Sequence, residues 1–226
     1  MVDMSKHLLT DNINKWYYLG MSDSKIYLLN KFADDLNGVF SVKDLEVLYS
    51  KNPLSKLQSQ RKIKSLVENK ELIKIKRGVY AKPNASLLDI VKRINPDSYI
   101  STGYVLAKNT LIGSVPEKKI QAIKLGRPRI FKSELGTIEF LSIKKDLFFG
   151  YKKINNINIA LPEKAFLDVC YYYFKGKKFS FNIQSDIDFE NLDFKLIEEY
   201  LKKYDIKFIN FFKKLMKWAK KKKMSY

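Results

Sequence analysis

Residues 55–80 read SKLQSQRKIKSLVENKELIKIKRGVY, a polar-faced helix that runs directly into a basic hairpin. Ser55 is a residue type that caps helix starts, and the helix is expected to end around Asn69. On a wheel of 100° per residue, one side of this helix is expected to be apolar. The residues assigned to that side are Leu57, Ile63, Leu66 and Val67. The pattern predicts a helix that packs on a core along one side only.

The other side of this helix carries hydrogen-bond donors. Arginine, lysine and glutamine side chains read base edges in the major groove of DNA, and cations also contact phosphates. We therefore expect a recognition helix, although a solvated charged face on a small helix-hairpin module is an alternative. The expected DNA-contacting residues of the helix are Gln58, Arg61, Lys62 and Ser65 on the face, with Lys64 at its border.

Two short strand-like runs follow the helix, over residues 72–76 and 79–82. Arg77-Gly78 between them supplies the positive φ angle that a tight hairpin requires. Alternation with period two directs Ile73 and Ile75 inward and the intervening cations outward. The hairpin residues expected at DNA are Lys74, Lys76 and Arg77.

Two more helices are predicted before this stretch, over residues 24–36 and 41–49, with a leading helix in residues 1–20. Ser41-Val-Lys-Asp44 resembles a capping box at the start of the second of these helices. Three helices followed by a hairpin match the winged helix-turn-helix plan, in which the third helix enters the major groove. We therefore expect a DNA-binding domain over residues 1–84. A winged helix that binds a protein instead is the alternative.

The composition favours a polyanionic partner. The 226 residues include 43 Lys and Arg against 24 Asp and Glu, which gives a net charge of +19. Residues 206–226 alone carry eight lysines and no acid, so they form either a solvated tail or an arm that grips phosphates. Nucleic acid and an anionic membrane surface are both compatible with such a charge.

Several classes of protein are disfavoured. The single histidine, His7, argues against histidine-based metal sites and Ser-His triads, and the single cysteine, Cys170, is expected to be a buried structural thiol. The sequence contains neither an apolar run of membrane-spanning length nor the apolar core of a signal peptide. We therefore expect a cytoplasmic protein with no cofactor, no metal and no membrane partner.

Residues 85–226 predict a mixed α/β domain with a mainly antiparallel sheet and a helical C-terminal end, so the whole chain is expected to be α+β. Ser101 is a predicted helix cap, and Pro162 suits the first turn of a helix that covers the sheet. The expected strands span residues 120–125, 128–131, 137–143 and 151–160. The expected helices span residues 87–94, 101–112, 162–173, 192–204 and 206–219.

Three motifs of this second part have open alternatives. Arg127 and Arg129 flank Pro128, and they form either a phosphate-gripping loop or simple solvated charge. The turn Pro162-Glu-Lys-Ala165 suggests a catalytic site, but ordinary helix capping accounts for it. Asp97 with Glu117-Lys-Lys119 imitates the Mg²⁺-binding carboxylates of a nuclease, although Glu117 falls in a predicted turn instead of a strand. We expect no enzyme activity, and a winged helix fused to a metal-dependent nuclease is the alternative.

A series of motifs from about Ser24 to Tyr173 resembles the AbiEi-type antitoxin and transcriptional regulator family. The motifs occur in this order: Leu72-Ile-Lys-Ile-Lys-Arg-Gly-Val-Tyr80, Ser98-Tyr-Ile-Ser101 with its helix, Gly136-Thr-Ile-Glu-Phe140, Phe148-Phe-Gly-Tyr151 and Ile159-Ala-Leu-Pro-Glu-Lys-Ala-Phe-Leu-Asp168. Residues 1–20 and those after Lys175 lie outside the resemblance.

The resemblance implies an antitoxin of a type IV toxin-antitoxin system, of the kind that acts in abortive infection and phage defence. Such a protein represses its own promoter by binding inverted repeats in double-stranded DNA. It counters a nucleotidyltransferase-like toxin encoded beside it without forming a stable complex. The recognition-helix cations, Lys76 and Arg77 are the positions to which DNA contact carries over. A module that neutralises a toxin by wrapping it is a further alternative.

Overall fold

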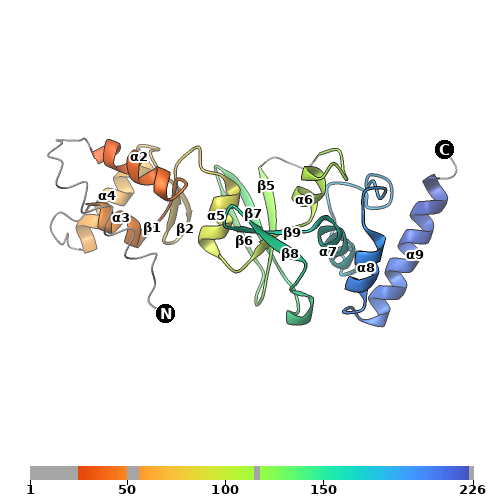
Figure 1. The fold of residues 1–226 in the computed structure, drawn as a ribbon. Helices are drawn as coiled ribbons and strands as arrows, with labels where there is room; N and C mark the ends of the chain where they lie inside the picture. The colour runs from red at the N-terminus through yellow and green to blue at the C-terminus, as the bar shows by residue number, and fades with distance from the viewer. Residues whose placement is uncertain (1–24, 50–55, 115–117, 224–226) are drawn as a thin grey trace. The chain divides into compact units, whose positions relative to one another are not determined.

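The computed structural model describes residues 25–49, 56–114 and 118–223. The chain divides into two compact units, residues 1–86 and 87–226 (Figure 1). The domain boundary expected after residue 84 is close to this division. Each unit has its own helices and its own sheet, so the chain is an α+β protein.

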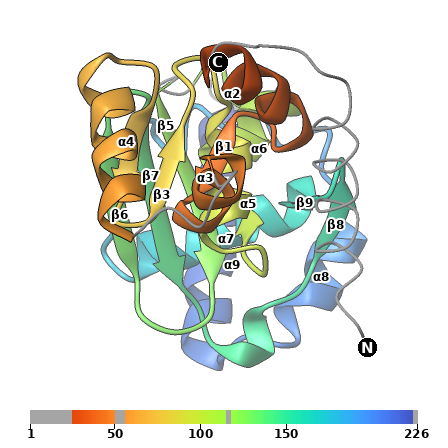
Figure 2. The same ribbon diagram turned by 90° about the vertical axis from the view of Figure 1, so that its left-hand side faces the viewer.

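The first unit follows the order helix, strand, helix, helix, strand, strand (Figure 2). The three predicted helices and both hairpin strands are confirmed, whereas the first strand was not expected. The leading helix predicted in residues 1–20 lies outside the described residues. The elements are α2 Lys25–Asp35, β1 Val39–Ser41, α3 Val42–Tyr49, α4 Lys56–Glu68, β2 Ile73–Lys76 and β3 Val79–Ala81.

The short sheet of this unit has the order β1-β3-β2, and both pairings are antiparallel. Asn37 and Gly38 have φ angles of 51° and 70°, which turn the chain from α2 into β1. Ser41 then begins α3 as predicted: its backbone N donates to Asp44 Oδ2 at 2.6 Å, and Asp44 N donates to Ser41 Oγ at 3.3 Å. This reciprocal pair satisfies two amides at the helix start.

One core holds the first unit together. Ile63 is the fully packed side chain from α4, while Leu66 and Val67 are partly buried against the same core. Leu72 N also donates to Leu66 O at 3.1 Å, which ties the hairpin to the end of α4. The buried members of this core are Leu29, Phe32, Ala33, Phe40, Leu45, Ile63 and Leu72.

The second unit contains a sheet with the order β6-β7-β5-β4-β9-β8. Its strands are β4 Tyr99–Ile100, β5 Lys119–Lys124, β6 Arg129–Ser133, β7 Gly136–Ser142, β8 Tyr151–Ile154 and β9 Ile157–Ala160. Its helices are α5 Leu87–Ile94, α6 Gly103–Lys108, α7 Pro162–Phe174, α8 Phe194–Leu201 and α9 Ile206–Lys223, with the short 3-10 helix η1 Lys145–Leu147.

The expectation of a mainly antiparallel sheet is confirmed in part: three of the five pairings are antiparallel, but the sheet is mixed. The pairings β4–β5, β6–β7 and β8–β9 are antiparallel, whereas β5–β7 and β4–β9 are parallel. Alternation of side chains predicts strands but not which strands pair. The central β4 is also too short to show any alternation, with only two residues.

Two local predictions in this unit are wrong. Residues 151–160 form two strands and not one, because Asn155 and Asn156 have φ angles of 47° and 63° and turn the chain into a hairpin. Ser101 does not cap α6, since its hydroxyl donates to Asp168 Oδ2 at 2.7 Å. Thr102 stands at the N-cap position without a side-chain capping bond.

Figure 1 shows α5 on one face of this sheet and α6 and α7 on the other, with α8 and α9 beyond α7. Phe166 of α7 packs edge-on against Phe212 of α9, with ring centroids 5.8 Å apart. The helix α9 runs to Lys223, four residues past its predicted end at Ala219. Cys170 is fully buried in α7, as predicted.

Candidate nucleic-acid interface

The outer face of α4 is defined by its buried side. Ile63 and Ser59 are each 4% exposed, and they mark the side that packs on the core. Arg61 lies about 160° from Ile63 around the helix, and Gln58 and Ser65 lie about 60° and about 40° from Arg61, both on the same side. Gln58, Arg61 and Ser65 are exposed, as expected for a contact face.

Two cations at the borders of this face are less available. Lys62 is partly buried on the flank of the helix. Lys64 is exposed, but its ammonium lies 3.5 Å from Glu68 Oε1 one helical turn later. An exposed pair of this kind is worth little in stability, but the carboxylate does offset the charge of Lys64. Arg61 makes no ion pair within the described residues, so it is the strongest candidate for base contact on α4.

The prediction that Leu57 lies on the packed side of α4 is wrong. Its side chain is 56% exposed. At 100° per residue Leu57 lies about 120° from Ile63, and Ser59 occupies the inner position instead. The outer face of α4 therefore presents an apolar side chain beside its donors, a combination that suits contact with thymine methyl groups.

The three cations of the hairpin differ in their exposure to solvent. Lys74 is exposed and pairs in register with Tyr80, and Arg77 is exposed at the turn. A register shift between Lys74 and Lys76 interrupts the simple alternation. Lys76 is partly buried, and its ammonium donates to the Arg77 carbonyl at 3.1 Å. Lys74 and Arg77 are therefore the better exposed cations of the hairpin.

Arg127 and Arg129 belong to the second unit. Arg127 lies in the connection after β5, and Arg129 is the first residue of β6. Both are exposed, as expected. They form a basic feature of their own on a different unit from α4 and the hairpin.

The second unit encloses an ion pair at its centre. Lys164 and Asp168 lie one turn apart on α7, both are 0% exposed, and the ammonium donates to the carboxylate. Asp168 also accepts from Ser101 Oγ at 2.7 Å and from Tyr99 Oη at 3.1 Å. Burial lowers the pKa of Lys164 below the ordinary lysine value. These bonds hold α7 against β4 and the start of α6.

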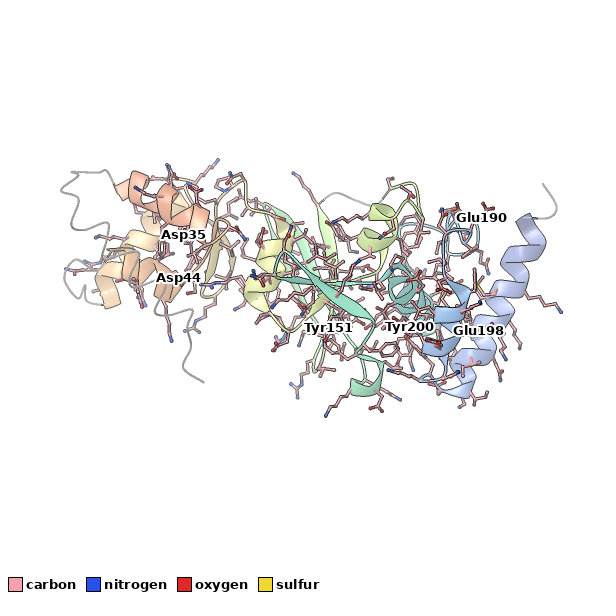
Figure 3. All side chains as sticks on the ribbon, in the orientation of Figure 1. Asp35, Asp44, Tyr151, Glu190, Glu198 and Tyr200 are labelled. Carbon is pink, nitrogen blue, oxygen red and sulfur yellow. The ribbon has the colours of Figure 1, made fainter. Side chains whose placement is uncertain are left out.

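Aromatic rings surround the Lys164 ammonium. It lies 5.1 Å from the Phe149 ring centroid, 5.5 Å from Tyr99 and 6.0 Å from Tyr204. Tyr151 stacks on the far side of Tyr99, and Tyr200 packs edge-on against Phe149. Figure 3 labels these two outer rings, on β8 and α8. A cation enclosed by ring faces gains electrostatic stabilisation that partly offsets its lost hydration.

The side chains of the Pro162-Glu-Lys-Ala165 turn therefore make contacts that stabilise the fold. Lys164 is sealed from solvent, and Glu163 is 8% exposed and accepts from Asp193 N at 3.2 Å. Gly150 leaves room for the lysine stem, because a Cβ there would come within 2.9 Å of Lys164 Cγ. These contacts explain why a glycine follows Phe148-Phe149 and why lysine and aspartate are spaced by four residues.

A second polar group joins the sheet to the end of α7. Glu139 on β7 accepts from Gln121 Nε2 at 2.7 Å and from Lys177 Nζ at 2.5 Å. Lys119 adds a cation at 3.6 Å, and Thr102 donates to Gln121 at 2.7 Å. Burial alone raises the pKa of Glu139, but the hydrogen bonds from Lys177 and Gln121 outweigh it and lower that pKa below its usual value.

We expect Glu139→Gln to lower the free energy of unfolding by about 1–3 kcal/mol at neutral pH, because it removes a carboxylate bonded to charged groups. A lowered native pKa stabilises the fold above the unfolded value near 4.5, and this contribution is lost as the pH falls through the native pKa. Denaturant unfolding of both proteins between neutral and acid pH measures it. The difference should shrink on acidification. A difference that stays constant with pH contradicts the assignment, and the exposed Glu134→Gln is the control.

The structure describes three members of the nuclease-like constellation, Asp97, Lys118 and Lys119. Asp97 is exposed, and Lys119 pairs with Glu139 instead. Glu117 lies outside the described residues. Within residues 25–49, 56–114 and 118–223, no three histidine, cysteine, aspartate or glutamate side chains are grouped to hold a metal ion.

Comparison with models of protein families and with curated protein sequences finds no match for this chain. The likeness to AbiEi-type antitoxins therefore depends on the motif residues themselves. None of the helices in the described part of the chain is long and apolar enough to cross a membrane.

Proposed function

We propose that this chain is a sequence-specific DNA-binding regulator whose first unit is a winged helix-turn-helix domain. The observation that supports it most is the exposed outer face of α4 in a unit with the order helix, strand, helix, helix, strand, strand. The third helix of such a unit is the one that enters the major groove. The hairpin of β2 and β3 is the wing.

The proposed contacts divide between base reading and phosphate binding. Arg61 and Gln58 project from the middle of the outer face of α4, where a guanidinium pairs with guanine and an amide with adenine. Leu57 adds an apolar surface for thymine methyl groups. Lys74 and Arg77 on the wing bind phosphates, and Lys64 does so at the border of the helix. The net charge of +19 strengthens every such contact.

The antitoxin role follows from the motif resemblance. The protein represses its own promoter at inverted repeats, and it counters a nucleotidyltransferase-like toxin without a stable complex. The motif residues of the second unit have contacts that fit a supporting role, since Tyr99, Ser101, Lys164 and Asp168 bond to one another in its interior. Those contacts stabilise the fold of the second unit, and the resemblance assigns toxin neutralisation to this unit. We place the protein in the cytoplasm without a cofactor, as the sequence predicts.

A cellular experiment tests both roles. A reporter driven by the DNA upstream of this reading frame is expected to fall several-fold in activity when the full chain is expressed. The variant Arg61→Ala should relieve that repression. Coexpression of the chain should also restore growth to cells that express the neighbouring nucleotidyltransferase-like product. Reporter activity that does not respond to the chain contradicts the regulator, and stoichiometric copurification of the two proteins favours toxin wrapping.

A further inference from the structure

The connection between β5 and β6 is an exposed part of the second unit. β5 and β6 both flank β7, so the connection crosses the end of that strand. Residues 125–130 are all exposed in an unbroken run. The sequence of this run is Leu-Gly-Arg-Pro-Arg-Ile. We call residues 125–130 the β5–β6 loop; its last two residues, Arg129 and Ile130, are the first two of β6 and pair with Phe140 and Glu139 of β7.

The loop is strongly cationic. Residues 118–133 contain six lysines and arginines and no acid. The ammonium of Lys124 donates to the Leu125 carbonyl at 3.1 Å, so it lies along the base of the loop. Ile143 N donates to the Lys124 carbonyl at 3.2 Å. The next residue after Ile143 is the exposed Lys144, which adds another cation near the base of the loop. Arg127 and Arg129 make no ion pair with any carboxylate of the described residues.

Large apolar side chains are exposed at both ends of the same loop. Leu125 is 43% exposed and Ile130 is 58% exposed. A solvated charged surface explains exposed arginines, but it does not explain two exposed apolar side chains next to them. Proteins that bind the minor groove of DNA combine these features, since arginines enter the groove and apolar side chains press on the base steps.

The backbone of the loop presents its two arginines in a way that a narrow groove can accept. The chain bends through Leu125–Arg127, with Gly126 at a φ angle of 79°, and becomes extended at Arg129, where β6 begins. Arg127 therefore projects from a turn, and Arg129 from the start of the adjoining strand. The minor groove is only about 6 Å wide, so it excludes a helix but admits single long side chains that project from a turn.

We propose that the β5–β6 loop binds the minor groove of A·T-rich DNA through Arg127 and Arg129. A·T pairs present acceptors on the groove floor, whereas a G·C pair adds the guanine amino group. A·T tracts also have a narrow groove with a strong negative potential, which attracts guanidinium groups. The inference rests on DNA being the partner, as in the proposed function, but it assigns a second groove and a different unit of the protein.

Inosine substitution provides the test. Short duplexes without the promoter sequence are prepared with A·T, G·C or I·C pairs, and binding of the full chain is measured by fluorescence anisotropy. An I·C pair has the minor-groove floor of an A·T pair, because inosine lacks the amino group of guanine. We expect the A·T and I·C duplexes to bind about tenfold tighter than the G·C duplex.

The variant Arg127→Ala/Arg129→Ala is expected to lose this preference while it retains its residual affinity for the G·C duplex. The control Lys152→Ala/Lys153→Ala removes the same number of charges from exposed positions on β8 and should keep the preference. An equal loss on all three duplexes, or a preference that survives in the arginine variant, overturns the proposal.

The outcome is separable from that of the proposed function. Arg61→Ala should leave the A·T preference intact, because Arg61 lies on the other unit. If promoter specificity is absent while the loop-dependent preference is present, only the proposed function fails. If promoter specificity is present without that preference, only the loop proposal fails. A chain that binds neither the promoter nor any of these three duplexes contradicts both.

Discussion

Replacing Arg61 with alanine is expected to weaken binding to promoter DNA by about 10- to 100-fold while changing affinity for shuffled DNA by less than about threefold. Arg61 is exposed near the centre of the outer face of α4, and it makes no ion pair within the described part of the chain. In the proposed complex the Arg61 guanidinium donates two hydrogen bonds to guanine, and only the correct sequence offers that guanine.

Lys74→Ala is the matched comparison. Lys74 is also an exposed cation of the first unit, but it lies on the hairpin. Its removal should weaken binding to promoter and shuffled DNA by similar factors, because a phosphate contact does not depend on sequence. Fluorescence anisotropy with both duplexes measures the two variants. If Arg61→Ala also weakens both duplexes equally, α4 does not read bases through this residue.

Replacing Lys164 with methionine is expected to lower the unfolding free energy of the second unit by about 3–5 kcal/mol. The change keeps most of the side-chain volume but leaves the Asp168 carboxylate at 0% exposure without its cation. Tyr99 and Ser101 still donate to that carboxylate, but they supply no charge. Denaturant unfolding, followed by far-UV circular dichroism, measures the loss.

The double variant Lys164→Met/Asp168→Leu separates charge from packing. A buried ion pair replaced by apolar residues of similar volume often costs little, because the desolvation of both charges is removed as well. The double variant should therefore recover part of the stability that the single variant loses; the recovery is incomplete because Tyr99 and Ser101 lose their acceptor. Lys195→Met, at an exposed position on α8, is the control for a general effect of the substitution. A single-variant loss below about 1 kcal/mol would show that Lys164 is not needed to compensate Asp168.

Much of the fold could be predicted because its local signals are strong. Ser41 and Asp44 have the spacing of a capping box and form both of its bonds. Pro162 begins α7 as expected. Ile63 identified the packed side of α4, and Arg77-Gly78 placed the hairpin turn, with Gly78 at a φ angle of 83°. The cap, the helix start and the turn depend on residues that are close in the sequence, and the packed side of α4 follows from helical spacing.

What escaped prediction depends on contacts between distant residues. Tyr99 and Ile100 pair in parallel with Asn158 and Ile159, and no local pattern indicates that partner. The spacing of Lys164 and Asp168 is that of an ordinary exposed helix pair. Only the rings and hydroxyls brought by other segments show that the pair is buried.

The candidate site was predictable in part. The outer position of Arg61 follows from helical geometry. The apolar character of Leu57 predicts the packed side of α4, but its position about 120° around the helix from Ile63 predicts exposure, and the position decides. The apolar flanks of Arg127 and Arg129 were missed for a different reason: whether Ile130 on the edge strand β6 is covered depends on tertiary structure, and it is 58% exposed.

The central claim is that α4 and its hairpin recognise a particular DNA sequence. The most direct test is the ratio of dissociation constants for promoter DNA and for shuffled DNA of the same composition, measured over a range of salt concentrations. We expect a ratio of about a thousand or more at physiological salt. Both affinities should fall steeply as salt rises, because phosphate contacts release counterions. Equal affinity for the two duplexes, or affinity that is insensitive to salt, would contradict the account.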